Sequence, residues 1–256
     1  MIFDTHAHYD DDAFAEDAEA LLKSFAESGS LRIANIGASM EGSRSSIALA
    51  DKYEFMYAAI GLHPDYAGDW NEETKAKLTA LSVNPKCVAI GEIGLDYYYE
   101  EPGREIQKKA FAGQLALARE LKLPVVIHSR DAAKDTLDLI KKSGIAEEGG
   151  IMHCFSYPPE VAKECLDLGF FIGIGGALTF KNARKLPDVV SMCPMERIVI
   201  ETDCPYMAPV PFRGKRNDSS YLTYVVEKIA EIKGISIEEV MRITYENAIK
   251  VYRITA

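Results

Sequence analysis

The chain has 256 residues, of which 48% are hydrophobic and 27% charged, and this composition excludes a largely disordered or low-complexity protein. Its formal net charge of -10 argues against broad, non-specific coating of nucleic acid, because that binding depends on Lys and Arg neutralising phosphates. No apolar run approaches the ~18–20 residues of a membrane span, and the first residues do not resemble a signal peptide. We therefore expect a cytoplasmic globular protein that does not enter a membrane.

Eight short apolar runs, rich in Ile, Val and Phe, predict buried parallel strands. They cover residues 2–5, 32–36, 56–60, 88–90, 125–127, 150–152, 170–174 and 198–200. Helical stretches fall between or after them, at residues 11–28, 102–121, 131–142, 158–168, 218–233 and 236–251. This alternation over 256 residues predicts an α/β protein with one domain, a (β/α)8 TIM barrel over residues 1–256. A doubly wound sheet would be expected to carry a glycine-rich turn after its first strand, where this chain has His-Ala-His.

The first strand ends in the sequence Asp4-Thr5-His6-Ala7-His8. Side chains two residues apart on a strand point to the same face, so His6 and His8 can aim together into a barrel and hold one metal ion. A His-x-His pair alone is more often two surface or hydrogen-bonded histidines. The other three histidines also follow apolar runs, which favours the metal interpretation.

Further metal-binding residue types appear where other predicted strands end. They are His63, Glu92, His128, His153 and Asp203. The strand ends of a barrel meet on the face where barrel enzymes place their chemistry. Any one of these residues could instead cap a helix. Mixed imidazole and carboxylate ligands suit Zn²⁺, Mn²⁺ or a similar ion, and six ligands would furnish a binuclear site with one bridging carboxylate. His63 precedes Pro64 and is expected to face substrate from a loop.

Residues next to these ligands suggest supporting roles. Strand alternation places Asp4 on the face of His6 and Glu201 on the face of Asp203, where each could orient an imidazole or make only a structural hydrogen bond. The five cysteines form no C-x-x-C pair and are expected to be free thiols. Cys154 and Cys204 follow a ligand directly, so alternation should turn them away from the site as packing residues.

Cations on the same face could hold an anionic substrate. Arg130 shares the face of His128 if the strand continues that far. Arg213, Lys215 and Arg216 form a basic loop after the eighth strand, which is either a solvated charge run or a grip on the phosphate backbone. Aromatic residues just beyond strand ends are candidates for stacking unpaired bases, with simple packing as the alternative. They are Tyr66, Trp70, Tyr97, Tyr98, Phe155, Tyr157 and Tyr206.

Several motifs together resemble the TatD family of metal-dependent deoxyribonucleases, in the amidohydrolase superfamily. They are Phe3-Asp4-Thr5-His6-Ala7-His8, Gly61-Leu62-His63-Pro64, Gly91-Glu92-Ile93-Gly94-Leu95-Asp96-Tyr97, Val126-Ile127-His128-Ser129-Arg130, His153-Cys154-Phe155-Ser156, Glu201-Thr202-Asp203 and Arg213-Gly214-Lys215-Arg216-Asn217. The resemblance runs nearly end to end. It departs at Asn217-Asp218-Ser219, where the family often has proline shortly after the asparagine.

The resemblance implies a (β/α)8 barrel that binds two divalent ions, Mg²⁺, Mn²⁺ or Zn²⁺. His6, His8 and Asp203 would hold one ion, His128 and His153 the other, and Glu92 would bridge both. The implied activity is metal-dependent cleavage of DNA, often from the 3′ end.

From the chemistry of the reaction, we expect Asp203 to accept the proton of the attacking water, and His63 and Arg130 to hold phosphate oxygens. The expected partner is DNA, as single strands or 3′ ends, with no obligatory protein partner. The alternatives are hydrolysis of another ester, an amide or a lactone, and a non-catalytic metal-binding protein.

Overall fold

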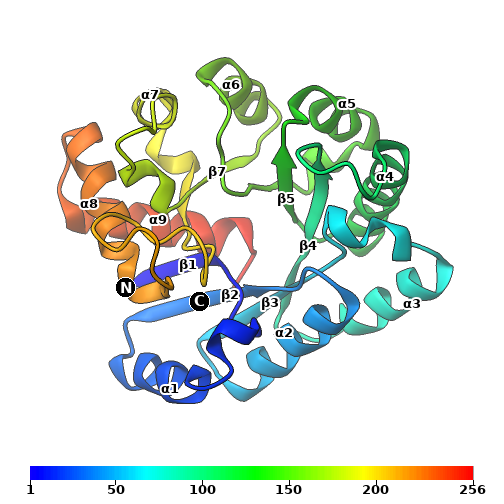
Figure 1. The fold of residues 1–256 in the computed structure, drawn as a ribbon, viewed down its shortest axis with the longest axis horizontal. Helices are drawn as coiled ribbons and strands as arrows, with labels where there is room; N and C mark the ends of the chain where they lie inside the picture. The colour runs from blue at the N-terminus through cyan, green and yellow to red at the C-terminus, as the bar shows by residue number, and fades with distance from the viewer. Residues whose placement is uncertain (256) are drawn as a thin grey trace.

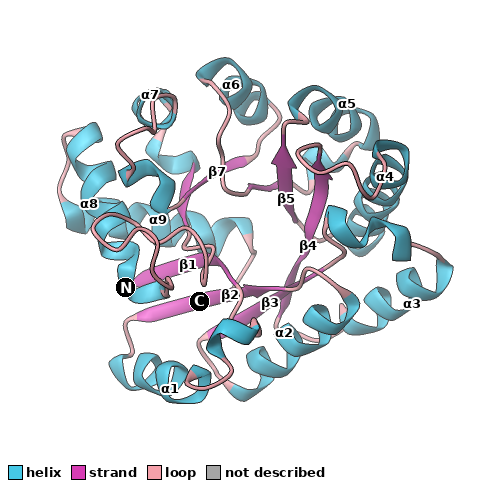
Figure 2. Cartoon of the chain, viewed as in Figure 1, coloured by secondary structure: helices cyan, strands magenta, loops and turns pink. Residues whose placement is uncertain are grey.

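The computed structural model describes residues 1–255, in which eight parallel strands follow one another around a barrel and the helices surround it (Figures 1 and 2). The strands are β1 (Ile2–Ala7), β2 (Leu31–Ile36), β3 (Met56–Ile60), β4 (Cys87–Asp96), β5 (Val125–Arg130), β6 (Gly150–Met152), β7 (Phe171–Ile174) and β8 (Ile198–Ile200). Each pairs with the next in parallel. The predicted (β/α)8 TIM barrel is confirmed.

The first and last strands meet at the end that carries the predicted ligands. Ala7 forms a parallel bridge with Cys204. The amide of Asp203 donates to the carbonyl of His6, and the amide of His8 donates to the carbonyl of Cys204, both at 2.9 Å. These bonds close the barrel and join two segments that carry candidate metal ligands.

The helices cover the outer face of the barrel and one of its ends. They are α1 (Ala18–Ser28), α2 (Met40–Lys52), α3 (Glu72–Leu81), α4 (Arg104–Leu121), α5 (Ala133–Ser143), α6 (Pro159–Asp167), α7 (Leu186–Met192), α8 (Leu222–Lys233) and α9 (Ile237–Val251). Helices α2, α3 and α7 are not among those predicted from the sequence. None of the helices within residues 1–255 is long and apolar enough to cross a membrane.

The predicted helix over residues 11–28 is wrong at its start. Asp11 caps a 3-10 helix, Asp12–Phe14, and α1 begins only at Ala18. The Asp17 amide bonds the carbonyl of Phe14, three residues back, so the carbonyl of Ala13 is left for the Arg216 guanidinium, 2.9 Å away. Arg216 also pairs with the Asp17 carboxylate. A distant cation therefore holds this segment in a turn.

Apolar side chains fill the barrel interior near the amino-terminal ends of the strands, and α9 closes that end of the barrel. Phe3, Val126 and Val199, near the starts of their strands, belong to one buried cluster with Ala248 and Tyr252 of the carboxyl-terminal segment. The other end of the barrel carries the polar side chains. This division leaves the chemistry to the carboxyl-terminal ends of the strands.

The pairing register of β1 is irregular near the candidate metal ligands. In β1, Asp4 pairs with Ile33 and Ala7 with Asn35, so β1 holds one extra residue, a β-bulge. The bulge breaks the alternation between Asp4 and His6. Of the two alternatives for Asp4, the structure favours the structural hydrogen bond. Its carboxylate accepts from Thr202, from Ser219 and from the backbone amide of His6, while Nδ1 of the His6 ring has no hydrogen-bond partner within residues 1–255.

The fourth strand is longer than its apolar run predicts. β4 continues to Asp96 because it pairs with β5 as far as Arg130, with Gly94 opposite His128. Glu92 thus lies inside the strand rather than after it. Since alternate residues share a face, Glu92 and Asp96 lie on the same side of β4, and both contact the His128 imidazole.

Candidate metal centre

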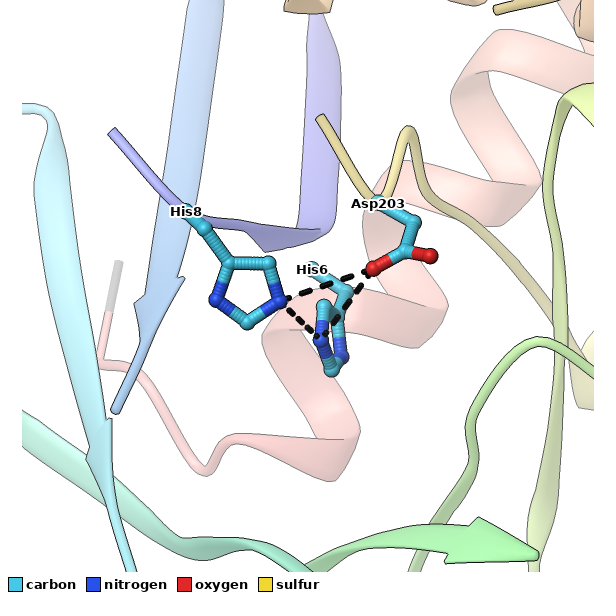
Figure 3. A group of neighbouring side chains, drawn as sticks. All are labelled: His6, His8 and Asp203. Carbon is cyan, nitrogen blue, oxygen red and sulfur yellow. Dashed lines mark hydrogen bonds and ion pairs between the residues drawn. The ribbon is translucent and has the colours of Figure 1, made fainter. Parts of the chain in front are cut away.

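Two histidines of β1 and its following turn meet an aspartate from the segment after β8 (Figure 3). The Nε2 atoms of His6 and His8 lie 3.1 Å apart. Asp203 Oδ1 lies 3.8 Å from the first and 3.5 Å from the second. Two nitrogens bound at 2.0–2.1 Å to one tetrahedral zinc would be about 3.3 Å apart. The group can therefore hold a metal ion with little movement.

Glu92 presents its two carboxylate oxygens to different histidines. Oε2 lies 3.4 Å from His6 Nε2 and 4.0 Å from His8 Nε2. Oε1 lies 2.9 Å from His128 Nδ1 and 3.9 Å from His153 Nε2. This buried side chain thus stands between two sets of imidazoles, as a bridging ligand would.

The second group of possible ligands differs from the one implied by the family resemblance. His63 Nε2 lies 4.0 Å from Glu92 Oε1, and His63, Glu92 and His128 form a metal-capable cluster. His153 Nε2 lies 3.6 Å from Asp203 Oδ1, closer than it lies to Glu92. His63 was expected to face substrate, and the structure places it beside the ligands.

In two histidines, the ring nitrogen that points away from the ligand cluster interacts with an oxygen of the protein. His8 Nδ1 hydrogen-bonds the carbonyl of Ile36 at 2.8 Å, and His128 Nε2 lies 3.0 Å from Asp96 Oδ2. Metal-binding histidines commonly bind a carbonyl or carboxylate through the nitrogen that does not touch the metal. In both residues the other nitrogen faces the ligand cluster, so the donor set fits a metal.

Glu201, for which the sequence left open an imidazole-orienting or a purely structural role, lies beside the His153 imidazole. Its Oε2 lies 3.1 Å from His153 Nδ1, although both atoms are buried without a hydrogen bond of good angle. Its Oε1 accepts a hydrogen bond from the Cys154 amide at 2.6 Å. A Cβ added at Gly173 would come within 2.5 Å of Oε2, so this glycine leaves room for the carboxylate.

Two residues of the site were missed or misplaced by sequence reasoning. Asp96 was not proposed, although its spacing of four from Glu92 would have identified it in a longer strand. Cys154 was expected to turn away, but it lines the cavity and lies in a cluster with His153 and Asp203. β6 ends at Met152, and Cys154 adopts a positive φ of 43°, so strand alternation no longer applies. Cys204 is buried as expected.

The carboxylates change the protonation of the imidazoles they face. Burial lowers the pKa of His8, but the hydrogen bond and charge of Asp203 outweigh it and raise that pKa to about 9. Burial likewise opposes protonation of His128, and its bonds to Asp96 and Glu92 raise its pKa to about 10. Without metal, both imidazoles therefore carry a proton at neutral pH.

Burial and neighbouring charges also set the pKa values of His153, His6 and Glu92. Burial lowers the pKa of His153, but the charges of Glu201 and Asp203 raise it to about 9. Burial and the charge of His153 lower the pKa of His6 to about 4. Burial raises the pKa of Glu92, yet the surrounding imidazoles hold it well below its usual range. Without metal at neutral pH, Glu92 is therefore anionic and His153 is protonated, whereas His6 is neutral.

These groups open into a cavity of ≈1060 Å³, and Arg130 lies on its wall. The basic loop does not line the cavity. The Arg216 guanidinium pairs with Asp17 through both terminal nitrogens, and Arg213 lies 4.2 Å from the centre of the Phe180 ring. Lys215 is exposed, 5.7 Å from the Phe212 ring.

Comparisons with known proteins agree with this geometry. A protein of Bacillus subtilis (strain 168), named "Uncharacterized metal-dependent hydrolase YabD", is 45% identical over 254 residues, covering 99% of this chain and 100% of that protein. "Uncharacterized metal-dependent hydrolase TatD" of Mycobacterium tuberculosis is 35% identical, covering 97% of each. A crystal structure of "YJJV, TATD Homolog" from Escherichia coli K12 superposes with a TM-score of 0.92 at 31% identity, covering 99% of this chain and 98% of that one. The model of the family described as "TatD related DNase" matches residues 3–253, and the chain therefore belongs to this family.

Proposed function

We propose that the protein is a metal-dependent hydrolase that cleaves phosphodiester bonds of DNA, as a 3′–5′ exodeoxyribonuclease acting on single strands or 3′ ends. The observation that carries the proposal is Glu92, whose two oxygens face separate groups of histidines. One carboxylate in that position suits a binuclear site. The description of the family as DNases supports DNA as the substrate.

In the proposed site, His6, His8 and Asp203 would hold one divalent ion, His128 and His153 would hold the other, and Glu92 would serve both. Mg²⁺, Mn²⁺ and Zn²⁺ are the candidates. When bound, two such ions neutralise charge on the phosphate and lower the pKa of a water. The proximity of His63 to Glu92 and His128 adds a possible ligand to the second set.

The chain's own groups would then complete the reaction. Asp203 would accept the proton of the attacking water and so become a neutral carboxylic acid; its Oδ1 lies 3.5 Å from His8 Nε2 and 3.6 Å from His153 Nε2. Arg130 would hold a phosphate oxygen at the cavity wall, and His63 would hold another if it does not bind metal. Arg213 and Lys215 are the loop cations available for more distant phosphates, because each contacts an aromatic ring but no carboxylate within residues 1–255, whereas Arg216 is paired with Asp17.

A second candidate is hydrolysis of a carbon ester, amide or lactone. It is favoured by the acidic side of the cavity, where Asp10, Asp11, Asp12 and Glu41 would repel a polyanion. We also propose that the protein works in the cytoplasm, where thiols stay reduced, since all five cysteines are free.

The test uses 5′-labelled and 3′-labelled single-stranded DNA, duplex DNA, RNA and an aminoacyl ester. Each is incubated with metal-stripped protein alone and with Mg²⁺, Mn²⁺ or Zn²⁺ added back. We expect nucleotides to be released from the 3′ end of single-stranded DNA only when metal is restored. Turnover of the ester without any DNA cleavage would refute the proposal in favour of the second candidate.

A further inference from the structure

Two adjacent tyrosines and an arginine form an exposed group on the rim of the cavity. Tyr98 and Tyr99 are 59% and 56% exposed, and their rings meet edge to face with centroids 4.9 Å apart. The Arg130 guanidinium carbon lies 3.7 Å from the centre of the Tyr98 ring and 5.6 Å from that of Tyr99. We call Tyr98, Tyr99 and Arg130 the aromatic platform. Burial does not account for the position of such large exposed rings.

The platform is tied to the candidate metal ligands. Arg130 ends β5, two residues after His128, and pairs in register with Asp96 of β4. Asp96 accepts the Tyr98 amide through Oδ1 at 2.9 Å and approaches His128 Nε2 through Oδ2 at 3.0 Å. The Asp96 carboxylate thus contacts both the imidazole of a candidate metal ligand and the backbone of Tyr98. The platform therefore stands at a set position relative to the reacting centre.

Charge around the cavity is distributed unevenly. Within residues 1–255, Arg130 is the one Lys or Arg among the residues that line the cavity, and it follows β5. The acidic residues Asp10–Asp12, Glu41 and Asp65 follow β1, β2 and β3, and β1 lies across the barrel from β5 (Figure 1). An anionic chain is therefore attracted to the wall formed by the ends of β4 and β5. Tyr99 lines the cavity on that same wall.

We propose that the aromatic platform binds an unpaired nucleobase of the substrate beside the phosphate being cleaved, an inference that rests on the proposed function. Arg130 and Tyr99 face the cavity, and Tyr98 supports the guanidinium from behind. Bases stack on tyrosine rings and on arginine planes, and such stacking tolerates any sequence. Because a base within a duplex is already stacked and paired, the platform selects single-stranded ends.

Binding is measured with a single-stranded oligonucleotide that carries 2-aminopurine as its 3′-terminal base and a phosphorothioate at the last linkage to resist hydrolysis. The metal-loaded protein should quench the 2-aminopurine fluorescence as the base stacks. Tyr99→Ala should weaken this binding roughly 5- to 150-fold, which corresponds to the stacking of one base. Tyr99→Phe should bind like the unmodified protein, because it keeps the ring.

The comparison is Tyr206→Ala, which removes a rival candidate for base stacking, another rim tyrosine that is 56% exposed and lines the cavity beyond β8. If Tyr99 binds the base, this variant should bind within about twofold of the unmodified protein, since the Tyr206 hydroxyl donates to Asp11 and the ring lies beside acidic residues that repel an anionic strand. Metal content and circular dichroism of each variant establish that the site and the fold are intact. Equal loss of binding in Tyr99→Ala and Tyr206→Ala would overturn the proposal.

A second oligonucleotide that lacks the terminal base isolates the contribution of that base to binding. An oligonucleotide with a tetrahydrofuran residue in place of the terminal nucleoside should bind the unmodified protein more weakly, and Tyr99→Ala should then weaken it no further. If Tyr99→Ala weakens the abasic and complete oligonucleotides equally, the platform does not read a base. If metal-loaded unmodified protein cleaves normal and abasic ends at equal rates, the platform proposal fails while the nuclease proposal stands. If it neither binds nor cleaves any DNA, both fail.

Discussion

Replacing Asp96 by asparagine should weaken one metal position and spare the other. Asp96 is buried and its Oδ2 lies 3.0 Å from His128 Nε2, while its Oδ1 accepts the Tyr98 amide. Asparagine keeps the size and can still accept that amide, but it removes the negative charge that raises the pKa of His128. The imidazole loses both its orientation and part of its basicity.

The expected magnitude follows from the role of such supporting groups. Loss of a carboxylate behind a metal-binding histidine costs about 10- to 100-fold in metal affinity, or about 1.4–2.7 kcal/mol. The ion held by His128 should bear this loss. The ion held by His6, His8 and Asp203 should not, because Asp96 contacts none of those three side chains in residues 1–255.

The assay is a metal titration of the stripped protein, followed by metal analysis after dialysis against a weak chelator. Two binding steps are expected in the unmodified protein, with only one of them weakened in Asp96→Asn. Asp12→Asn serves as the control, since Asp12 lines the same cavity but is exposed and contacts no candidate ligand. The reasoning is refuted if both steps weaken equally, or if Asp12→Asn has the same effect.

Three further outcomes are expected. Metal binding at pH 7 should release protons from His8, His128 and His153, because their raised pKa values of about 9, 10 and 9 keep them protonated without metal. Metal affinity should therefore rise with pH. Calorimetry in buffers of different ionisation enthalpy measures the number of protons released. Lys215→Ala should reduce the salt slope of single-strand binding by about 0.7. Arg216→Ala should change it less because Asp17 already neutralises Arg216, and unchanged binding by Lys215→Ala would exclude Lys215 from DNA contact. Gly173→Ala should displace the Glu201 carboxylate and weaken metal binding roughly tenfold in the same titration. Normal metal affinity in this variant would show that metal binding by His153 does not depend on Glu201.

Much of the site could be predicted because barrel topology is simple. Each strand ends on the same face, so residues as distant as His6 and Asp203 had to meet once eight strands were identified. Apolar runs located those strands correctly. The ligand types then indicated metal chemistry without any knowledge of distances.

The errors have one physical origin, which is that strand alternation holds only where pairing is regular. A bulge in β1 separates Asp4 from the face of His6, and the positive φ of Cys154 turns its thiol into the cavity. β4 runs past its apolar residues because β5 pairs with it, which placed Asp96 beyond the predicted strand. Pairing partners and backbone turns of this kind are tertiary features, and no local pattern encodes them.

The basic loop illustrates a limit of a different kind. A run of cations in the sequence does not say which of them already has a partner. Arg216 pairs with Asp17, about 200 positions away in the chain, and it also donates to the Ala13 carbonyl, which lies within the helix predicted at residues 11–28. The cation that does line the cavity, Arg130, came from strand register instead.

The central claim is that Glu92 joins two metal positions into one reactive centre, and the most direct test compares Glu92→Gln with His63→Ala. Metal bound per chain and nucleotide release from 3′-labelled single-stranded DNA are measured on the same samples. Glu92→Gln should lose most of both ions and all measurable cleavage, because its two oxygens serve both sets of histidines. His63→Ala should keep at least the ion of His6, His8 and Asp203 while cleavage slows. Full occupancy of both positions in Glu92→Gln would contradict the account.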